Sequence, residues 1–391
     1  MQKKILVASF QSLTKDSAGG IGKLAYALSA ALHGKGILQS FIVSSKGKFN
    51  THFPSLPVHS LSRYYLYILN KIKLKPYISR YIQEVLYDRF CAMRLRRDTA
   101  ALVATTPYLF HTFSKAQKWN IPIFFIPGNP EDNYIYKIVS EENERYGIKE
   151  IDAYTYKKRL DYYNRSIVLV DTILIYSSLM EDTYRKAGYS NRIIAVYGYL
   201  KQSINNVVIE KQEGKVFKVS FLAYSVLLKG LQYLLEAWKD LQHIPDIELH
   251  IGGDIDENVQ NIIDKDFSEL KNVFYHGKIS DVPGFFADKS IYILTSLIDG
   301  APVTILEAMR SGLAVICTEN CGTKDILEEG KSGWVIPIRN EEAIKSQIVT
   351  AYSNRENTRQ MGIYAKSVID HYNMTEFINN LTNTIENKIT S

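Results

Sequence analysis

The chain has 391 residues, more than one ordinary domain holds, and its 46% hydrophobic and 23% charged residues are typical of a globular protein. No apolar run approaches the roughly 18–20 residues that a membrane-spanning helix needs. The apolar stretch after Lys3 and Lys4 is too short for a secretory signal. Cys91, Cys317 and Cys321 form neither an even set for disulfides nor a zinc-ligand spacing. These features argue against disordered, collagen-like and disulfide-stapled classes, and they predict a cytoplasmic protein of two domains.

The two halves of the chain carry opposite net charge. Residues 1–216 contain 31 Lys and Arg against 17 Asp and Glu, whereas residues 217–391 contain 16 against 24, so the overall charge of +6 conceals a basic first half. Basic residues concentrate in the segment Arg63–Arg97, where tyrosines lie among them. This mixture suits an anionic bilayer surface, although a solvated helical face or stacking on RNA would use the same residues. We expect contact with the inner face of a membrane and no nucleic-acid partner, because nothing resembles a nucleic-acid-binding module.

Short β-rich runs alternate with helical stretches along the whole chain, a pattern that predicts parallel sheets covered by helices. In the first half we expect strands at Lys4–Phe10, Leu38–Val43, Ile121–Ile126 and Thr172–Tyr176, and a helix at Gly22–Leu32. The polar segment 201–216 predicts a linker between a first domain at 1–200 and a second at 217–370.

The second half repeats the alternation. Expected strands are Val216–Ala223, Glu248–Gly252, Asn272–His276, Ser290–Thr295, Leu313–Thr318 and Trp334–Ile336. Expected helices are Gly230–Leu241, Asn258–Leu270, Pro302–Ser311, Lys324–Glu329 and Glu341–Ser353, with two more between Arg355 and Ile389. This order predicts an α/β protein of two Rossmann-like, doubly wound parallel-sheet domains that face a cleft.

Glycines follow the first predicted strand, in the sequence Gly19-Gly20-Ile21-Gly22. They allow a ligand to approach the backbone, and the start of the following helix offers free N–H groups to an anion. A tight strand–helix turn would use the same glycines. No acidic residue ends the second strand, which argues against a nicotinamide-cofactor dehydrogenase because such a residue binds the ribose.

A second loop, Asp299-Gly300-Ala301-Pro302-Val303-Thr304, runs from a strand into a helix that carries Glu307. Pro suits the first turn of a helix, so the loop presents backbone N–H groups where a diphosphate would be stabilised. Two carboxylates at this spacing can bind hydroxyls of a sugar and a ribose. They lie on one element and so do not flank a glycosidic bond as in a hydrolase. A helix cap and a surface glutamate would look the same in isolation.

Two further patterns complete the set. Lys229-Gly230 follows a β-rich run and opens a helix, where a lysine can neutralise a diphosphate. Gly322, Asp325 and the Gly330–Gly333 turn form a later α/β connection.

In order and spacing, these motifs resemble the C-terminal half of the family 4 retaining glycosyltransferases, which have the GT-B fold. Lys229-Gly230 corresponds to that family's KG segment. Asp299 and Glu307 keep its spacing of eight, with Asp in place of the first Glu. The resemblance is strongest over 217–340.

The resemblance implies a role for each matching position. Lys229 would bind the diphosphate of a nucleotide sugar, Asp299 the hydroxyls of its sugar, and Glu307 the ribose. Further donor-binding residues would be Gly20, Gly22, Gly300, Ala301, Pro302, Val303, Thr304, Lys278 and Ile279. The final helix, 371–391, would cross back toward the N-terminal domain, which would bind the acceptor. No obligatory metal or other cofactor is implied.

Two positions depart from the family pattern. Ala223-Tyr224 replaces a Gly-Arg pair, which removes one cation expected on the diphosphate. Asn129 lies where the family commonly has a histidine near the acceptor, and His111 is the other candidate for that place.

The resemblance therefore implies a retaining hexosyltransferase that transfers a sugar from a nucleotide sugar to a glycan or lipid-linked acceptor of a cell-surface polysaccharide. Two alternatives stay open. One is a weakly active or inactive homologue that acts as a partner subunit, and the other is a sugar-nucleotide epimerase of related fold.

Overall fold

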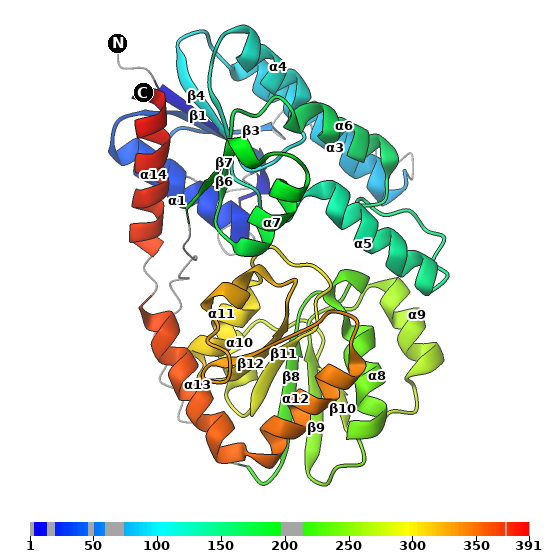
Figure 1. Cartoon of the computed structure of the whole chain (residues 1–391). Helices are drawn as coiled ribbons and strands as arrows, with labels where there is room; N and C mark the ends of the chain where they lie inside the picture. Colours follow the sequence, from blue (N-terminus) through cyan, green and yellow to red (C-terminus); the bar gives the residue numbers. More distant parts are fainter. Residues whose placement is uncertain are drawn as a thin grey trace.

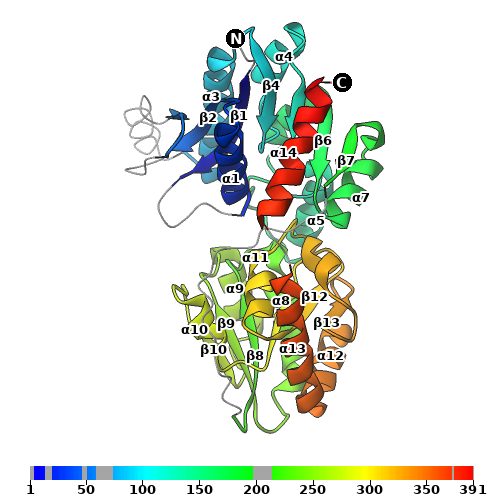
Figure 2. The same ribbon diagram turned by 90° about the vertical axis from the view of Figure 1, so that its left-hand side faces the viewer.

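The computed structural model describes residues 4–13, 20–45, 51–58, 74–196, 214–371 and 374–390. The predicted linker therefore lies almost wholly outside the described residues, as do Gly19 and the first part of the basic segment. The chain forms two lobes stacked end to end (Figure 1), and a view at right angles separates the same two lobes (Figure 2). Within the described residues, no helix is long and apolar enough to cross a membrane.

The N-terminal lobe is built on a seven-stranded sheet with the order β3-β2-β1-β4-β5-β6-β7, in which every pair is parallel. Its strands are β1 (Lys4–Ser12), β2 (Leu38–Ser45), β3 (Ser55–Pro57), β4 (Thr99–Ala104), β5 (Ile123–Phe125), β6 (Thr172–Ile175) and β7 (Ile193–Ala195). The central strands are rich in Ile, Val, Leu and Phe and are buried on both faces, as parallel strands between helical layers must be.

The C-terminal lobe repeats this plan with a six-stranded parallel sheet of order β10-β9-β8-β11-β12-β13. Its strands are β8 (Phe217–Leu222), β9 (Ile247–Gly252), β10 (Val273–Tyr275), β11 (Ile291–Leu294), β12 (Ala314–Thr318) and β13 (Gly333–Ile336). Two doubly wound parallel sheets confirm the predicted fold class.

Helices cover both faces of each sheet (Figure 1). The N-terminal lobe contains α1 (Gly20–Gly34), α3 (Pro76–Arg94), α4 (Phe110–Lys118), α5 (Asp132–Arg145), α6 (Lys157–Ile167) and α7 (Ser178–Lys186). The C-terminal lobe contains α8 (Leu231–Leu241), α9 (Glu257–Asp266), α10 (Val282–Phe286), α11 (Val303–Arg310), α12 (Glu341–Ser353) and α13 (Arg355–Asp370). The last helix is α14 (Met374–Thr390).

Three predictions of local structure were wrong or incomplete. The helix expected at Lys324–Glu329 is a short 3-10 helix over Gly322–Ile326. The helix expected to reach Leu270 ends at Asp266, and Phe267 leaves the helical backbone conformation. Strand β4 lies among the central strands of its sheet, yet it was not predicted from the sequence.

The final helix, α14, returns to the N-terminal lobe. It lies beside α1 (Figure 2), and Phe377, Leu381 and Ile385 are buried in the N-terminal core. At an exposed edge, Lys35 forms an ion pair with Glu386. The two lobes are thus connected through the tail as well as through the segment that precedes β8.

Helix α5 belongs to the N-terminal half of the chain but packs in the hydrophobic core of the C-terminal lobe. Ile135, Ile138 and Val139 belong to the hydrophobic cluster of the C-terminal lobe. At the far end of α5 the carboxylate of Glu142 is buried, and it accepts hydrogen bonds from Tyr233 Oη (2.9 and 3.0 Å) and from Arg339 Nε (2.6 Å). An N-terminal helix is therefore held in the C-terminal lobe by apolar packing and a buried ion pair.

Glu142→Ala should destabilise the C-terminal lobe by about 3–5 kcal/mol, because it leaves Arg339 and Tyr233 without their shared acceptor. Urea unfolding followed by tryptophan fluorescence would measure this, since Trp238 and Trp334 both lie in that lobe. Glu141→Ala is the control, because Glu141 is half exposed and should contribute less than about 1 kcal/mol. Equal effects of the two substitutions would contradict a stabilising role of the buried Glu142 carboxylate.

Candidate functional site

Each sheet reverses its strand order at one place, between β1 and β4 in the N-terminal lobe and between β8 and β11 in the C-terminal lobe. In open α/β sheets, ligands bind beyond the carboxyl ends of the strands at such a switch point. The segments that follow β8 and β11 contain Lys229 and Asp299. Both residues thus lie where this fold places a ligand.

Lys229 and Asp299 form an ion pair between these two segments. Their side chains are 25% and 14% exposed, so the pair is only partly open to solvent. Burial lowers the pKa of Lys229, but the carboxylate of Asp299 outweighs burial and holds the pKa above its ordinary value. The lysine therefore stays charged, and an anionic ligand would meet a cation that is already positioned.

Gly230 is required by the backbone next to Lys229. Its φ is +67°, in the left-handed region that favours glycine, and a Cβ there would overlap the carbonyl oxygen of Thr295 at the end of β11. The close packing of these two segments brings Lys229 toward Asp299.

The loop after Asp299 meets the N-terminal lobe. A Cβ on Gly300 would lie 2.7 Å from the carbonyl oxygen of Gly128 and 3.0 Å from Cα of Asn129. The Ser177 hydroxyl donates a hydrogen bond to the carbonyl oxygen of Gly300 (3.3 Å). The predicted donor loop and the predicted acceptor residue Asn129 are therefore neighbours across the cleft.

Two helix starts also face each other across the cleft. Gly20 is the first residue of α1, and a Cβ on it would contact Val303 Cγ2, in the first residue of α11, at 3.3 Å. Ala301 and Pro302 lead into α11, and Thr304 accepts a hydrogen bond from Tyr292 Oη (2.7 Å). Gly22 is buried inside α1. The first N–H groups of a helix have no partner one turn earlier in the same helix, so a helix start favours anions.

Glu307 lies on α11 and is partly buried. Burial raises the pKa of its carboxyl group, against the opposing effects of Lys23 and Arg310. Lys23 belongs to α1, so this electrostatic interaction joins the two lobes. Lys23 was not predicted as a site residue, although its place directly after Gly22 in the glycine motif is a signal that could have indicated it.

The predicted base-side loop follows the edge strand β10. Ile279 packs beneath Gly252, whose Cβ would lie 2.8 Å from Ile279 Cγ1, while Lys278 is exposed. The amide of Gly253 donates a hydrogen bond to the carbonyl oxygen of Gly277 (2.7 Å), which ties this loop to the end of β9. The loop is thus two strands away from the segment that carries Lys229.

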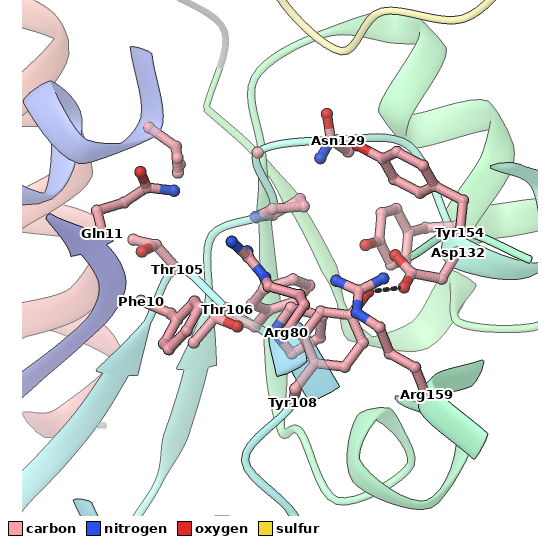
Figure 3. A pocket seen from close by; sticks show the side chains of 16 residues that line it. Phe10, Gln11, Arg80, Thr105, Thr106, Tyr108, Asn129, Asp132, Tyr154 and Arg159 are labelled. Atoms are coloured by element: carbon pink, nitrogen blue, oxygen red, sulfur yellow. Dashed lines mark hydrogen bonds between the residues drawn. The ribbon is translucent and has the colours of Figure 1, made fainter. Parts of the chain in front are cut away.

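A cavity of about 110 Å³ opens at the switch point of the N-terminal sheet (Figure 3). Its wall includes Gln11 near the end of β1, Thr105 and Thr106 after β4, and Asn129 and Asp132 after β5. Arg80 of α3 reaches into it, and its Nε donates a hydrogen bond to Glu84 (2.8 Å). The chemistry of this wall is that of a site for hydroxyl groups.

The two predicted acceptor-side candidates lie in different places. Asn129 lines the cavity, whereas His111 does not. His111 lies in the first turn of α4, where it is exposed and its amide donates to Asp88 (2.7 Å). His111 is therefore not brought to the cleft.

A larger cavity of about 840 Å³ lies between the lobes and shares Arg80 and Tyr154 with the smaller one. The C-terminal lobe lines it with Val226, Leu227 and Leu228, which immediately precede Lys229, and with residues 256–258 at the start of α9. Three residues that line the smaller cavity were not predicted from the sequence: Tyr154, Asp132 and Arg159. Among the described residues, no group of three or more His, Cys, Asp or Glu side chains is arranged to hold a metal ion.

Gly230→Ala should reduce stability by more than about 1–3 kcal/mol, the cost of a strained backbone, because its Cβ also overlaps Thr295. Displacement of Lys229 should weaken nucleotide binding at the same time. The control is Gly36→Ala, where φ is +73° and nothing lies within 4 Å. Thermal unfolding and nucleotide titration would compare them, and equally small effects would exclude the steric constraint.

Comparisons with known proteins agree with this geometry. Residues 203–368 match the family model described as Glycosyl transferases group 1. An uncharacterized glycosyltransferase of Haemophilus influenzae is 24% identical over 220 residues, which cover 54% of this chain and 60% of that protein. A putative colanic acid biosynthesis glycosyltransferase, WcaL of Salmonella typhimurium, is 30% identical over 74 residues, which cover 17% of this chain and 18% of WcaL.

The structural likeness extends over nearly the whole chain. The crystal structure of Anabaena HepE in complex with UDP has a TM-score of 0.65 at 14% identity, and the match covers 98% of this chain and 100% of HepE. The fold is thus GT-B, as the resemblance implied. The likeness to group 1 glycosyl transferases lies in the C-terminal half.

Proposed function

We propose that the protein is a retaining glycosyltransferase of family 4 type. It transfers a hexosyl group from a nucleoside-diphosphate sugar to a glycan or lipid-linked acceptor during synthesis of a cell-surface polysaccharide. The observation that carries the proposal is the Lys229–Asp299 pair at the switch point of the C-terminal sheet, with Asp299 on a loop that leads into α11, whose first residue faces the start of α1. The match of residues 203–368 to group 1 glycosyl transferases supports it.

In this proposal the donor lies between the lobes. Lys229 neutralises the diphosphate, together with the first turns of α1 and α11. Asp299 then binds hydroxyls of the donor sugar, and Glu307 binds the ribose. The loop containing Lys278 and Ile279 contacts the base. UDP is the first nucleotide to test, because HepE was solved with UDP.

Retention follows from attack on the face that the leaving group vacates. The acceptor oxygen forms a bond to the anomeric carbon while the bond from that carbon to the diphosphate oxygen breaks. The proton of the acceptor hydroxyl passes to a phosphate oxygen of the leaving group. The protein then contributes position and charge stabilisation. Because Lys229 and the helix starts supply positive charge, the proposal requires no obligatory metal or other cofactor.

A polysaccharide acceptor is supported by WcaL, whose name assigns it to colanic acid biosynthesis. One observation favours the alternative of a weakly active or inactive partner subunit. Tyr224 replaces the expected arginine after β8, and because a tyrosine side chain cannot carry a positive charge, this position brings no cation to the diphosphate. A sugar-nucleotide epimerase would instead convert the donor without an acceptor.

Calorimetric titration with UDP, GDP, ADP, CMP and their common sugars tests the donor site. We expect micromolar binding of one diphosphate, weakened by about 1–3 kcal/mol in Lys229→Ala, the range for a charged hydrogen bond. Lys239→Ala is the control, because Lys239 is an exposed lysine on the adjoining helix α8. Both variants need unchanged thermal unfolding for the comparison to hold.

The outcomes separate the alternatives. No binding of any nucleotide would favour the partner-subunit alternative. Conversion of a nucleotide sugar to its epimer without an acceptor would favour the epimerase. Transfer with an inverted anomeric centre, measured by nuclear magnetic resonance of the product, would contradict retention.

We further propose that the basic segment Arg63–Arg97 docks the protein on the anionic inner face of the membrane. Arg63, Lys71 and Lys73 lie outside the described residues. In the described part, Arg94, Arg96 and Arg97 are exposed at and beyond the end of α3, next to Met93, which is 70% exposed. Arg80 belongs to the cleft instead.

Sedimentation with phosphatidylcholine vesicles, with and without phosphatidylglycerol, tests this docking. We expect binding only to the anionic vesicles, and the double variant Arg96→Glu, Arg97→Glu should weaken it at least about tenfold, since each surface cation contributes about 1 kcal/mol. The control is Lys265→Glu, Lys331→Glu, which changes net charge equally on the C-terminal lobe. Equal weakening by both would show a net-charge effect and contradict a docking segment.

A further inference from the structure

The smaller cavity has a carboxylate in its wall to which the proposed function assigns no role. Asp132 is the first residue of α5 and lies three residues after Asn129, at the same edge of the sheet. Figure 3 shows Asp132 facing Tyr108 across one end of the cavity, with Asn129 and Tyr154 beside it. Asp132 thus lies beside the loop that packs against Gly300.

Within the part of the chain that the structure describes, one oxygen of this carboxylate has a hydrogen-bond partner. Oδ2 accepts a hydrogen bond from Tyr108 Oη. Oδ1 accepts no hydrogen bond from any residue that the structure describes. Arg159 lies close, but its donors are directed to Glu84 (2.7 and 3.0 Å) and to the carbonyl oxygen of Ala153 (3.1 Å). Oδ1 is therefore available to accept a hydrogen bond from a ligand in the cavity.

The surroundings make Asp132 titrate near neutral pH. Burial raises the pKa of its carboxyl group to about 6, although Arg159 and the hydrogen bond from Tyr108 act in the opposite direction. The carboxylates of Glu131 and Glu84 raise it slightly further. Several titratable or charged groups of the described residues face Asp132: Glu84 of α3, Tyr108, Glu131, Tyr154, Arg159 and Tyr163 of α6, and Tyr184 of α7.

The size of the cavity limits its occupant. Its 110 Å³ gives room for about ten water-sized groups, comparable with one pyranose ring. It continues at Arg80 and Tyr154 into the cavity of about 840 Å³ between the lobes. An occupant can therefore place one ring beside Asp132 and the rest of its length in the larger space.

We propose that Asp132 binds a hydroxyl group of the acceptor, and that the acceptor is a glycan of more than one sugar whose terminal ring occupies the smaller cavity. Asp132 Oδ1 accepts the hydrogen bond while Tyr108 holds Oδ2, which orients the terminal ring toward the Gly300 loop. This inference rests on the proposed function. It adds the residue that recognises the acceptor and the chain length of the acceptor.

This inference is tested with the whole chain by measuring the release of UDP from UDP-glucose, UDP-galactose and UDP-N-acetylglucosamine. The acceptors are p-nitrophenyl glycosides of one and of two to four sugars, with water as the acceptor in the blank. We expect kcat/KM for the acceptor to rise at least about fivefold from one sugar to two. For the wild type it should fall as the pH drops through about 6, because protonation removes the acceptor on Oδ1.

Two variants separate binding from folding. Asp132→Asn should lower kcat/KM for the acceptor at least about tenfold at pH 8. It should also remove the fall of kcat/KM at acidic pH and leave the KM for the donor within about twofold. Tyr108→Phe should keep the fall of kcat/KM at acidic pH but move it to higher pH. In the wild type the hydrogen bond from Tyr108 lowers the pKa of Asp132, so its loss raises that pKa. The control is Asp161→Asn, an exposed carboxylate of α6 outside the cavity, which should change none of these values.

Each outcome decides the inference. UDP release with the same pH profile in Asp132→Asn and the wild type would overturn the role of Asp132 and leave the proposed function intact. A kcat/KM independent of chain length would overturn the extended acceptor. No UDP release by the wild type with any acceptor would overturn the proposed function and this inference together. Should Asp132→Asn fail to fold, the shift in Tyr108→Phe decides alone.

Discussion

The packing of α5 against the C-terminal core is the constraint on which the cleft depends. This helix begins with Asp132 at the smaller cavity and carries Glu142 near its other end, inside the C-terminal lobe. Its 14 residues span about 21 Å at the rise of an α-helix. One rigid element therefore sets the distance between the wall of the N-terminal cavity and the segments that hold Lys229. Apolar burial of Ile135, Ile138 and Val139 stabilises that arrangement.

Glycines make the meeting of the lobes close. Gly300 approaches the backbone of Gly128 so closely that a side chain on Gly300 would displace that loop or Met180. The same steric constraint applies to Gly322, because a Cβ on it would overlap the carbonyl oxygen of Gly300. The region between Asp299 and Asn129 is thus lined largely by backbone, which offers rigid donors and acceptors at little cost in conformational entropy.

Much of the fold could be predicted because its signals are local. The alternation of buried strands with helices follows from hydrophobic periodicity, and Lys229, Asp299 and Gly300 lie within short motifs. The smaller cavity could not be predicted in this way, because its residues come from β1, β4, β5, α3 and α6 and meet only after folding. The same limit applies to His111 and Asn129. Both follow strands of one sheet, but His111 is exposed in the first turn of α4, whereas Asn129 lines the cavity.

The charges of the donor region come from both lobes, and this bears on the missing arginine. Tyr224 leaves Lys229 as the cation supplied by the segment after β8, and Asp299 already compensates part of its charge. Lys23 lies on the opposite helix α1 and lowers the pKa of Glu307, so its charge acts across the cleft. Coulomb attraction falls with distance and with the dielectric constant of the medium, so Lys23 acts strongly only while the lobes are close. The electrostatics of the donor region are therefore coupled to the approach of the two lobes.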